Sequence, residues 1–383
     1  MSNKKIPNIR FKHFTEEWSN HQLSDFFTKY QETVYLEDNK IYKQISVRNT
    51  GLIEHRCVNE GKNIGRKRQY LINLDKYPVT LTFTRQTIYE GGIGFIPKHL
   101  NKYIVTENMP LLSKNNNLDQ NFFTSLLLNH NYFYKAIELN TPIGSAQKAL
   151  HEKIWLKTNL LFPDIKEQSK IGAFMSLISN LIALYKKKCE KLEKIKSTLI
   201  KTLLDSSDSI FVKNEKYSFD RRLINEVISV IPFKKFICNK LDLNGSFPVI
   251  QQGDNPLIGY SNQMPYMKYE DVIVFGDHTL SLYKPTSPFL VATDGVKIIK
   301  NNDSYICKEF LIYLLINNLP KSEGYKRHFQ LLNGKEVNVI TSKNIQKILS
   351  NLFFSMDKSI ALCKRKCEKL ENIKKSLLEK MFI

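Results

Sequence analysis

The sequence predicts an α+β protein of two domains, each followed by a long helix. Three observations lead to this prediction: a duplicated helical segment, two stretches of mixed strand and helix signals, and a length of 383 residues. That length suits two or three domains, and a content of 42% hydrophobic and 11% aromatic residues supplies real cores. We expect domains over residues 1–165 and 207–342, and helices over 166–206 and 343–383.

The helices are predicted from an internal repeat. The hexapeptide KCEKLE occurs at residues 188–193 and again at 366–371. Around it, IALYKKKCEKLEKIK matches IALCKRKCEKLENIK at 12 of 15 positions, and the same offset of 178 places Gln168 on Gln346. In both copies the apolar residues recur at steps of four and three, which is the period of a coiled-coil-like helical stripe.

Each helix has one narrow apolar stripe and therefore needs a partner, which the other copy supplies. We expect the two helices to pack antiparallel and to relate the halves of the chain by a pseudo-twofold axis. Pro163 and Asp164 predict the start of the first helix, and Asp205 predicts its end. The side chains expected in this pair are Ile178, Ile182, Tyr185, Cys189, Leu192, Ile195, Leu199, Met356, Ile360, Cys363, Cys367, Leu370, Ile373 and Leu377.

The two domains show the same mixture of signals. In the first, VTLTFTRQTIYEGGIGFIP (residues 79–97) predicts strands around a Gly-Gly turn, and residues 121–139 predict a helix. In the second, the strand-like runs FPVIQQ, DVIVFGDHT and FLVATDGVKII precede the helical YICKEFLIYLLINNL. We therefore expect two diverged α+β domains of similar architecture.

Charge and cysteine usage limit the function classes. The net charge of +20 predicts an anionic partner, and segments 166–204 and 343–383 each carry +6 of it. The six cysteines show neither a CxxC pair nor zinc-finger spacing, so we expect free thiols and no metal. No apolar run reaches the ~20 residues of a membrane span, and the N-terminus lacks the apolar core of a signal peptide, so we expect a cytoplasmic protein.

Several phrases carry a resemblance to a known family. The carriers are the repeated helices and, in order along the chain, PNIRF and EEWSNHQLSDFF near the N-terminus, GSAQKAL (144–150), FPDIKEQSKI (162–171), FPVIQQGDNPLIGY (247–260), FGDHT (275–279), TDGVKII (293–299), GYKRHFQLL (324–332) and NIQKIL (344–349). Together they resemble the specificity (S) subunit of type I restriction-modification systems. The phrase expected to restart the second domain, SFDRRLINEVISVIPF, lacks the tryptophan that family members often have.

The resemblance implies a non-catalytic subunit that reads double-stranded DNA. Its two target-recognition domains would each read one half of a bipartite, asymmetric target. Its helices would set the spacer and dock two modification (methyltransferase) subunits, and restriction (motor–nuclease) subunits would join them. S-adenosylmethionine, ATP and Mg²⁺ would bind in those partners, with no cofactor in this chain and no membrane.

The sequence motifs also favour a chain that is not an enzyme. An adenine methyltransferase tetrapeptide of the NPPF or DPPY type is absent, and so is a P-loop. The glycines of GGIGF (91–95) suit a hairpin turn better than a cofactor loop. Asp277 and His278 could form an acid–base pair or a metal site, but a turn or a DNA-facing polar loop is the preferred interpretation.

Side-chain chemistry predicts candidate DNA contacts. Lysine and arginine bind phosphates, whereas arginine, lysine, asparagine, glutamine, serine and threonine read base edges. The candidates are Arg56, Lys62, Arg66, Lys67 and Arg68 in the first domain and Gln251, Gln252, His278, Lys326 and Arg327 in the second. For both groups a solvated loop is the alternative. A stand-alone DNA-binding regulator with a coiled-coil dimerisation arm remains the alternative function.

Overall fold

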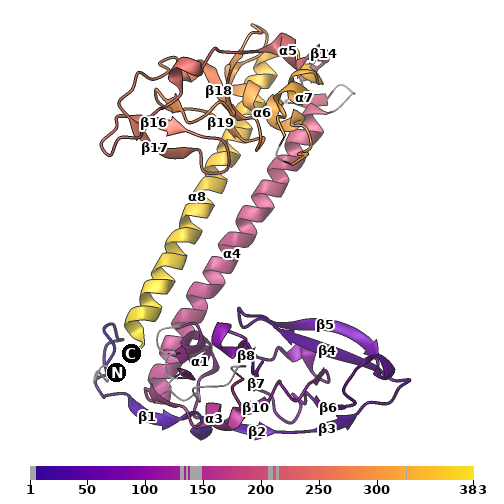
Figure 1. Cartoon of the computed structure of the whole chain (residues 1–383), viewed down its shortest axis with the longest axis vertical. Helices are drawn as coiled ribbons and strands as arrows, with labels where there is room; N and C mark the ends of the chain where they lie inside the picture. The colour runs from indigo at the N-terminus through magenta and orange to yellow at the C-terminus, as the bar shows by residue number, and fades with distance from the viewer. Residues whose placement is uncertain are drawn as a thin grey trace. The chain divides into compact units, whose positions relative to one another are not determined.

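The computed structural model describes residues 6–129, 133–134, 137–138, 149–205, 210–212, 215–324 and 326–383 (Figure 1). It divides into two compact units. Unit 1 holds Met1–Tyr185 together with Arg365–Ile383, and unit 2 holds Lys186–Lys364. The predicted α+β class and the two long helices, α4 (Ile165–Leu204) and α8 (Lys343–Met381), are confirmed. The predicted domain limits stay a prediction.

Unit 1 is built on two main sheets. An antiparallel sheet has the order β2-β10-β7-β8, and a five-stranded sheet has the order β3-β6-β9-β4-β5, in which β4 and β9 are parallel. The pair β1-β11 adjoins the start of α4 in the sequence. The bounds are β1 Ser19–Gln22, β2 Phe27–Tyr30, β3 Thr33–Tyr35, β4 Ile41–Val47, β5 Ile53–Glu60, β6 Arg68–Leu71, β7 Thr80–Phe83, β8 Ile93–Phe95, β9 Ile104–Val105, β10 Leu111–Lys114 and β11 Asn159–Phe162.

The helices of unit 1 close an aromatic core. They are α1 (Gln120–Leu127) and α3 (Glu152–Leu156), with short 3₁₀ turns η1 Leu23–Asp25, η2 Gly61–Asn63, η3 Ile88–Glu90 and η4 Lys98–Leu100. The helix predicted over residues 121–139 corresponds to α1, which is capped by the Asp119 side chain on the N–H of Phe122 and ends at Leu127. Most residues of that prediction beyond 129 lie outside the described part of the chain. The largest fully buried side chains here are Trp18, Phe27, Phe83, Phe122, Phe123, Phe133, Trp155 and Phe162.

Unit 2 shares with unit 1 the order of the antiparallel sheet and three strands of the second sheet. Its antiparallel sheet has the order β15-β21-β18-β19, and its second sheet has the order β17-β16-β20, with β16 and β20 parallel. The pair β14-β22 precedes α8 as β1-β11 precedes α4. The bounds are β12 Ile210–Val212, β13 Glu215–Tyr217, β14 Phe219–Leu223, β15 Ile228–Val230, β16 Phe247–Ile250, β17 Leu257–Ser261, β18 Val272–Gly276, β19 Leu282–Tyr283, β20 Leu290–Val291, β21 Val296–Asn301 and β22 Glu336–Ile340.

The helical elements of unit 2 are α5 (Ile224–Val227), α6 (Lys308–Asn318) and α7 (Phe329–Asn333), with 3₁₀ turns η6 Lys234–Phe236 and η7 Tyr269–Asp271. The phrase SFDRRLINEVISVIPF forms β14, α5 and β15, which correspond to β1, η1 and β2 of unit 1. The tryptophan missing from this phrase therefore does not alter the order of elements at the restart of the second domain.

The two long helices pack antiparallel within each unit. In unit 1 the first half of α4 meets the end of α8 through a cluster that holds Ile178, Ile182 and Cys367. In unit 2 the ion pairs Lys196–Asp357 and Glu193–Lys364 link α4 to the first half of α8. Residues early in α4 contact residues late in α8, and residues late in α4 contact earlier residues of α8, as in an antiparallel pair.

Most residues predicted for the helix pair are shielded from solvent, with two exceptions. Ile195 and Ile373, which occupy equivalent positions in the two copies, are each 40% exposed. The prediction was wrong there because two successive steps of three residues after Cys189 rotate the side chain away from the partner helix. Lys196, seven residues after Cys189, takes the inward position, and its side chain is only 16% exposed.

The start of each long helix is fixed by a buried glutamine. Asp164 caps α4 as predicted, accepting from the N–H groups of Lys166 (2.7 Å) and Glu167 (3.2 Å). Gln168 then accepts from the N–H of Asp119 (3.0 Å) and donates to the carbonyl of Pro163 (3.0 Å). The predicted stop after α4 begins at Asp205, and its following residues lie outside the described part.

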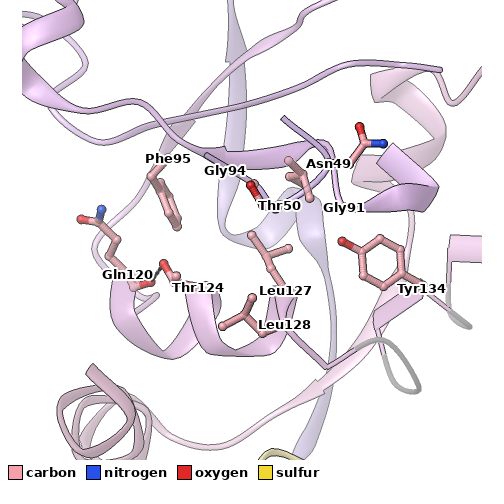
Figure 2. A pocket seen from close by; sticks show the side chains of 12 residues that line it. Asn49, Thr50, Gly91, Gly94, Phe95, Gln120, Thr124, Leu127, Leu128 and Tyr134 are labelled. Carbon is pink, nitrogen blue, oxygen red and sulfur yellow. Dashed lines mark hydrogen bonds between the residues drawn. The ribbon is translucent and has the colours of Figure 1, made fainter. Parts of the chain in front are cut away.

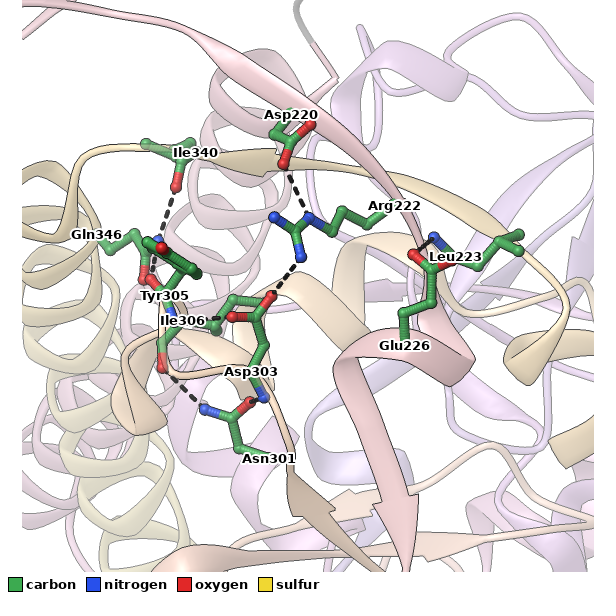
Figure 3. A network of polar contacts seen from close by, with 10 residues as sticks. All are labelled: Asp220, Arg222, Leu223, Glu226, Asn301, Asp303, Tyr305, Ile306, Ile340 and Gln346. Carbon is green, nitrogen blue, oxygen red and sulfur yellow. Dashed lines mark hydrogen bonds and ion pairs between the residues drawn. The ribbon is translucent and has the colours of Figure 1, made fainter.

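The equivalent Gln346 repeats this arrangement in unit 2. Its Oε1 accepts from the N–H of Cys307 at the start of α6 (2.7 Å). Its Nε2 donates to the carbonyls of Ile340 (2.7 Å) and Tyr305 (3.0 Å), as Figure 3 shows. In the same figure Arg222 joins β14 to this region through Asp303 (3.2 Å). Each glutamine, at the start of a long helix, thus hydrogen bonds to the end of the last strand of its domain and to the start of a domain helix, α1 for Gln168 and α6 for Gln346.

Candidate nucleic-acid interface

In unit 2, loops that are far apart in the sequence gather at one end of the sheets. The N–H of His278 donates to Oε1 of Gln252 (3.0 Å), and Nδ1 of His278 lies 3.1 Å from the carbonyl of Lys326. Three of the predicted contact residues, Gln252, His278 and Lys326, are therefore brought together. We call the loops 251–255, 277–281, 292–295 and 323–328 the unit 2 loop cluster.

Two glycines allow this close packing. A Cβ at Gly276 would lie 2.7 Å from Cβ of Gln252, and a Cβ at Gly295 would lie 2.9 Å from Nε2 of Gln252. Because both distances are shorter than side-chain contacts permit, the glycines of FGDHT and TDGVKII serve the approach of the 251–255 loop. Neither motif therefore needs a catalytic explanation.

The floor of the cluster is a buried polar pair. Asp277 is 2% exposed, and its carboxylate accepts from the N–H of Phe329 (2.8 Å) at the start of α7. His328 is fully buried; its Nδ1 donates to the Asp277 carbonyl (3.0 Å), and its Nε2 accepts from the N–H of Glu323 (3.0 Å). This geometry assigns a neutral His328 with the proton on Nδ1.

These contacts argue against the acid–base and metal alternatives for Asp277 and His278. The carboxylate of Asp277 holds α7, while the His278 ring is held by the Lys326 carbonyl. Among the described residues no group of three side chains is arranged to hold a metal ion. The arrangement instead stiffens a polar loop surface.

The cations at the rim of the unit 2 loop cluster have local carboxylate partners. Lys326 pairs with Glu323 (3.1 Å), and Arg327 pairs with Asp294 (3.1 Å), all four side chains being largely exposed. Exposed pairs of this kind contribute ~0–1 kcal/mol, so a phosphate can replace the carboxylate at little cost. Gln251, the remaining candidate, donates from Nε2 to the Asn255 carbonyl (3.0 Å) within its own loop.

The basic segment KNIGRKR of unit 1 lies between β5 and β6. Lys62 pairs with Glu60 (2.6 Å), Arg66 pairs with Glu107, and Lys67 pairs with Asp38. Arg68 begins β6 and stands over the Tyr70 ring, 5.7 Å from its centroid. The charge of this segment is therefore largely balanced by carboxylates, of which Asp38 and Glu107 are distant in the sequence.

Arg56 is separated from that segment. It lies on β5, is exposed, and lines a concavity of about 260 Å³ beside the ends of β4, β7 and β9. The concavity is polar at its rim, and the residues that line it are Gln44, Ile45, Ser46, Val47, Arg56, Thr84, Gln86, Ile104, Val105, Thr106, Asn108 and Met109. Of these residues, only Arg56 is among the DNA contacts predicted from the sequence.

A second hollow of about 320 Å³ lies between the β4–β5 turn, β8 and α1 (Figure 2). Burial raises the pKa of Tyr134, on its wall, to about 12. A Cβ on Gly91 would collide with the carbonyl of Asn49, and one on Gly94 would collide with the carbonyl of Gly51. The GGIGF glycines thus let the turn pack against β8, in agreement with the hairpin interpretation.

Two phrases that carry the resemblance lie partly outside the described residues. Of GSAQKAL only Ala149 and Leu150 are described, and in GYKRHFQLL residue 325 is not. Among the described residues, none of the helices combines the length and the apolar character that crossing a bilayer requires.

Comparisons with known proteins bear on the fold. No protein-family model matches the sequence. The crystal structure of a type I restriction-modification S subunit from M. genitalium superposes with a TM-score of 0.65 and 14% identity, covering 99% of both chains. A chain from a structural study of complex assembly and conformational transition in a type I R-M system gives a TM-score of 0.54 and 13% identity over 95% of this chain and 97% of that one. The chain therefore has the fold of the S subunits of type I restriction-modification systems, as the sequence resemblance predicted.

Proposed function

We propose that this chain is the non-catalytic, DNA-reading subunit of a type I restriction-modification complex. The observation that carries the proposal is the shared fold over 99% of both chains with an S subunit. The net charge of +20 supports an anionic partner, because a protein that displaces counterions from DNA gains much of its affinity from lysine and arginine. The polar loop cluster of unit 2 supports base reading.

The two domains would read two different half-sites of a bipartite, asymmetric target. They share the antiparallel sheet and three strands of the second sheet, but their loop side chains differ, so each would select its own bases. The long helices would set the spacer between the half-sites and dock two modification subunits through their basic faces. Restriction subunits, S-adenosylmethionine, ATP and Mg²⁺ would belong to the rest of the assembly, which would work in the cytoplasm.

The alternative, a stand-alone regulator with a dimerisation arm, has less support. Its arm would need helix surface that is free to pair with another chain. In both units the stripe of α4 is instead covered by α8 of the same chain. A subunit with internal pairing fits these contacts better.

Methylation-aware sequencing of the host genome tests the proposal. An asymmetric bipartite methylated motif should be present in the wild-type host and vanish when the gene is deleted. A host whose methylated motifs are identical with and without the gene would overturn the proposed function.

A further inference from the structure

The unit 2 loop cluster has a counterpart in unit 1 that backbone hydrogen bonds identify. The N–H of Asp277 donates to the carbonyl of Gly295 (2.8 Å), and its carbonyl accepts from the N–H of His328 (2.9 Å). In unit 1 the N–H of Arg85 donates to the carbonyl of Asn108 (3.2 Å), and its carbonyl accepts from the N–H of Leu150 (2.9 Å). Arg85 therefore occupies the position of Asp277 in the same topology.

It follows that Gln86 stands where His278 stands. Each directly follows the residue held by these hydrogen bonds, in the loop that joins equivalent strands, β7 to β8 in unit 1 and β18 to β19 in unit 2. Both loops face the turn of the neighbouring hairpin. In unit 1 Asn49 of that turn donates to Glu90, and in unit 2 the N–H of Gly253 donates to Ser281 (2.9 Å).

The parallel strands give a second, independent correspondence. Gln44 of β4 pairs with Ile104, the first residue of β9, and Val249 of β16 pairs with Leu290, the first residue of β20. Ser46 lies two residues after Gln44, and Gln251 lies two residues after Val249, so Ser46 and Gln251 occupy equivalent positions. Ser46 and Gln86 both line the 260 Å³ concavity, so the counterpart of the unit 2 loop cluster is this concavity.

The side chains at the concavity suit base edges. Arg56 and Gln86 are exposed at its rim, and Thr106 and Asn108 line it from the loop before β10. Within the described residues, neither Arg56 nor Gln86 has an ion-pair or hydrogen-bond partner on its side chain. Arginine matches the two acceptors of guanine, and glutamine matches the donor and acceptor of adenine in the major groove.

KNIGRKR lies at the other end of the same hairpin. The β4–β5 turn over residues 48–52 belongs to the concavity end, and KNIGRKR follows the last residue of β5 at the opposite end. Its cations Lys62, Arg66 and Lys67 are paired with carboxylates. In unit 2 the matching segment, residues 262–265, lies outside the loop cluster.

We propose that the first domain reads its half-site through Gln86 and Arg56 in this concavity, and that KNIGRKR carries no base-reading role. The proposal rests on the proposed function and adds to it the residues that determine specificity. Arg56 lies within β5, and Gln86 directly follows Arg85, whose N–H and carbonyl are both hydrogen bonded to the backbone, so both positions are held in a way that suits sequence discrimination.

The test replaces the gene in its host by Gln86→Ala or by Arg56→Gln and reads the methylated sites by sequencing. We expect one half of the motif to relax, so that sites with the wrong base at one position are methylated within about tenfold of the cognate site. The other half should keep its sequence. Gln120→Ala is the matched control, since Gln120 is an exposed glutamine of the same unit outside the concavity, and it should leave the whole motif unchanged.

Two results would overturn the proposal: full stringency in both variants, or relaxation of that half-site in a Lys62→Ala/Arg66→Ala/Lys67→Ala chain. Failure of the proposed function is distinguishable, because it appears already as an unchanged methylome in the deletion strain. Since the side chains of Gln86 and Arg56 are exposed, the melting temperatures of both purified variants should match that of the wild type. Each single variant is a test of the proposal by itself.

Discussion

The two domains share a backbone plan but differ in the side chains they present. Equivalent hydrogen bonds hold Arg85 in unit 1 and Asp277 in unit 2, and equivalent glutamines hold the starts of α4 and α8. Beside these fixed points, unit 2 presents Gln252 and His278 on a tightly packed loop surface, whereas unit 1 presents Arg56 and Gln86 around a concavity. The comparison shows a scaffold kept by backbone and buried contacts while the exposed positions diverge.

The largest effect is expected from the buried glutamines. Gln346→Ala would leave the N–H of Cys307 and the carbonyls of Ile340 and Tyr305 without their partner, at about 1–3 kcal/mol for each buried group. We expect a loss of roughly 4 kcal/mol in the free energy of unfolding, against roughly 3 kcal/mol for Gln168→Ala, which has two such contacts. Urea unfolding of the full chain measures both, with Gln120→Ala as the control. Equal, small losses would show that the glutamines are not the anchors.

A carboxylate in unit 1 makes its stability depend on pH. Burial alone would raise the pKa of Glu152, but hydrogen bonds from Lys29 and Arg85, each 2.6 Å, outweigh it and lower the pKa to about 2. A lowered carboxyl pKa stabilises the folded state above pH ~4.5, and this contribution of ~3 kcal/mol is lost as the pH falls towards 2. Thermal unfolding between pH 6 and pH 2.5 should show this loss in the wild type and a smaller one in Glu152→Gln. Parallel pH curves for the two proteins would contradict the assignment.

The glycines offer a matched pair within unit 1. Gly94→Ala places a methyl group against the carbonyl of Gly51, whereas Gly65→Ala meets nothing within 4 Å. We expect Gly94→Ala to lower the free energy of unfolding by ~2 kcal/mol and Gly65→Ala to change it by less than ~0.5 kcal/mol. Similar denaturation midpoints for these two variants would be inconsistent with close packing of the β4–β5 turn on β8.

Sequence reasoning predicted what depends on local periodicity and missed what depends on distant contacts. The helical stripes, the Asp164 cap and the alignment of Gln168 with Gln346 were all visible because each is a local or repeated pattern. The charge density of KNIGRKR predicts a DNA contact, but Asp38 and Glu107, which pair with its cations, lie elsewhere in the sequence. Gln86 carries no local signal, and it is identified as the equivalent of His278 only by the strand order and the backbone hydrogen bonds of Arg85 and Asp277.

The smallest effect is expected where the stripe prediction was wrong. Ile195→Ser and Ile373→Ser change side chains that are each 40% exposed, so each should cost less than ~0.5 kcal/mol. Ile182→Ser, at a position 9% exposed in the unit 1 helix pair, should cost several times more. Denaturant unfolding of the three variants measures these losses, and a loss at Ile195→Ser or Ile373→Ser as large as that at Ile182→Ser would contradict the outward orientation of the two isoleucines.

The division of labour between the domains is the central claim, and one measurement addresses it directly. The host gene is replaced by a Gln252→Ala/His278→Ala chain, and the methylated motif is compared with that of the wild type and of the Gln86→Ala chain. The account predicts that the two replacements relax opposite halves of one bipartite motif and leave the remaining half intact. Relaxation of the same half by both replacements, or a uniform loss of methylation without any change of motif, would contradict it.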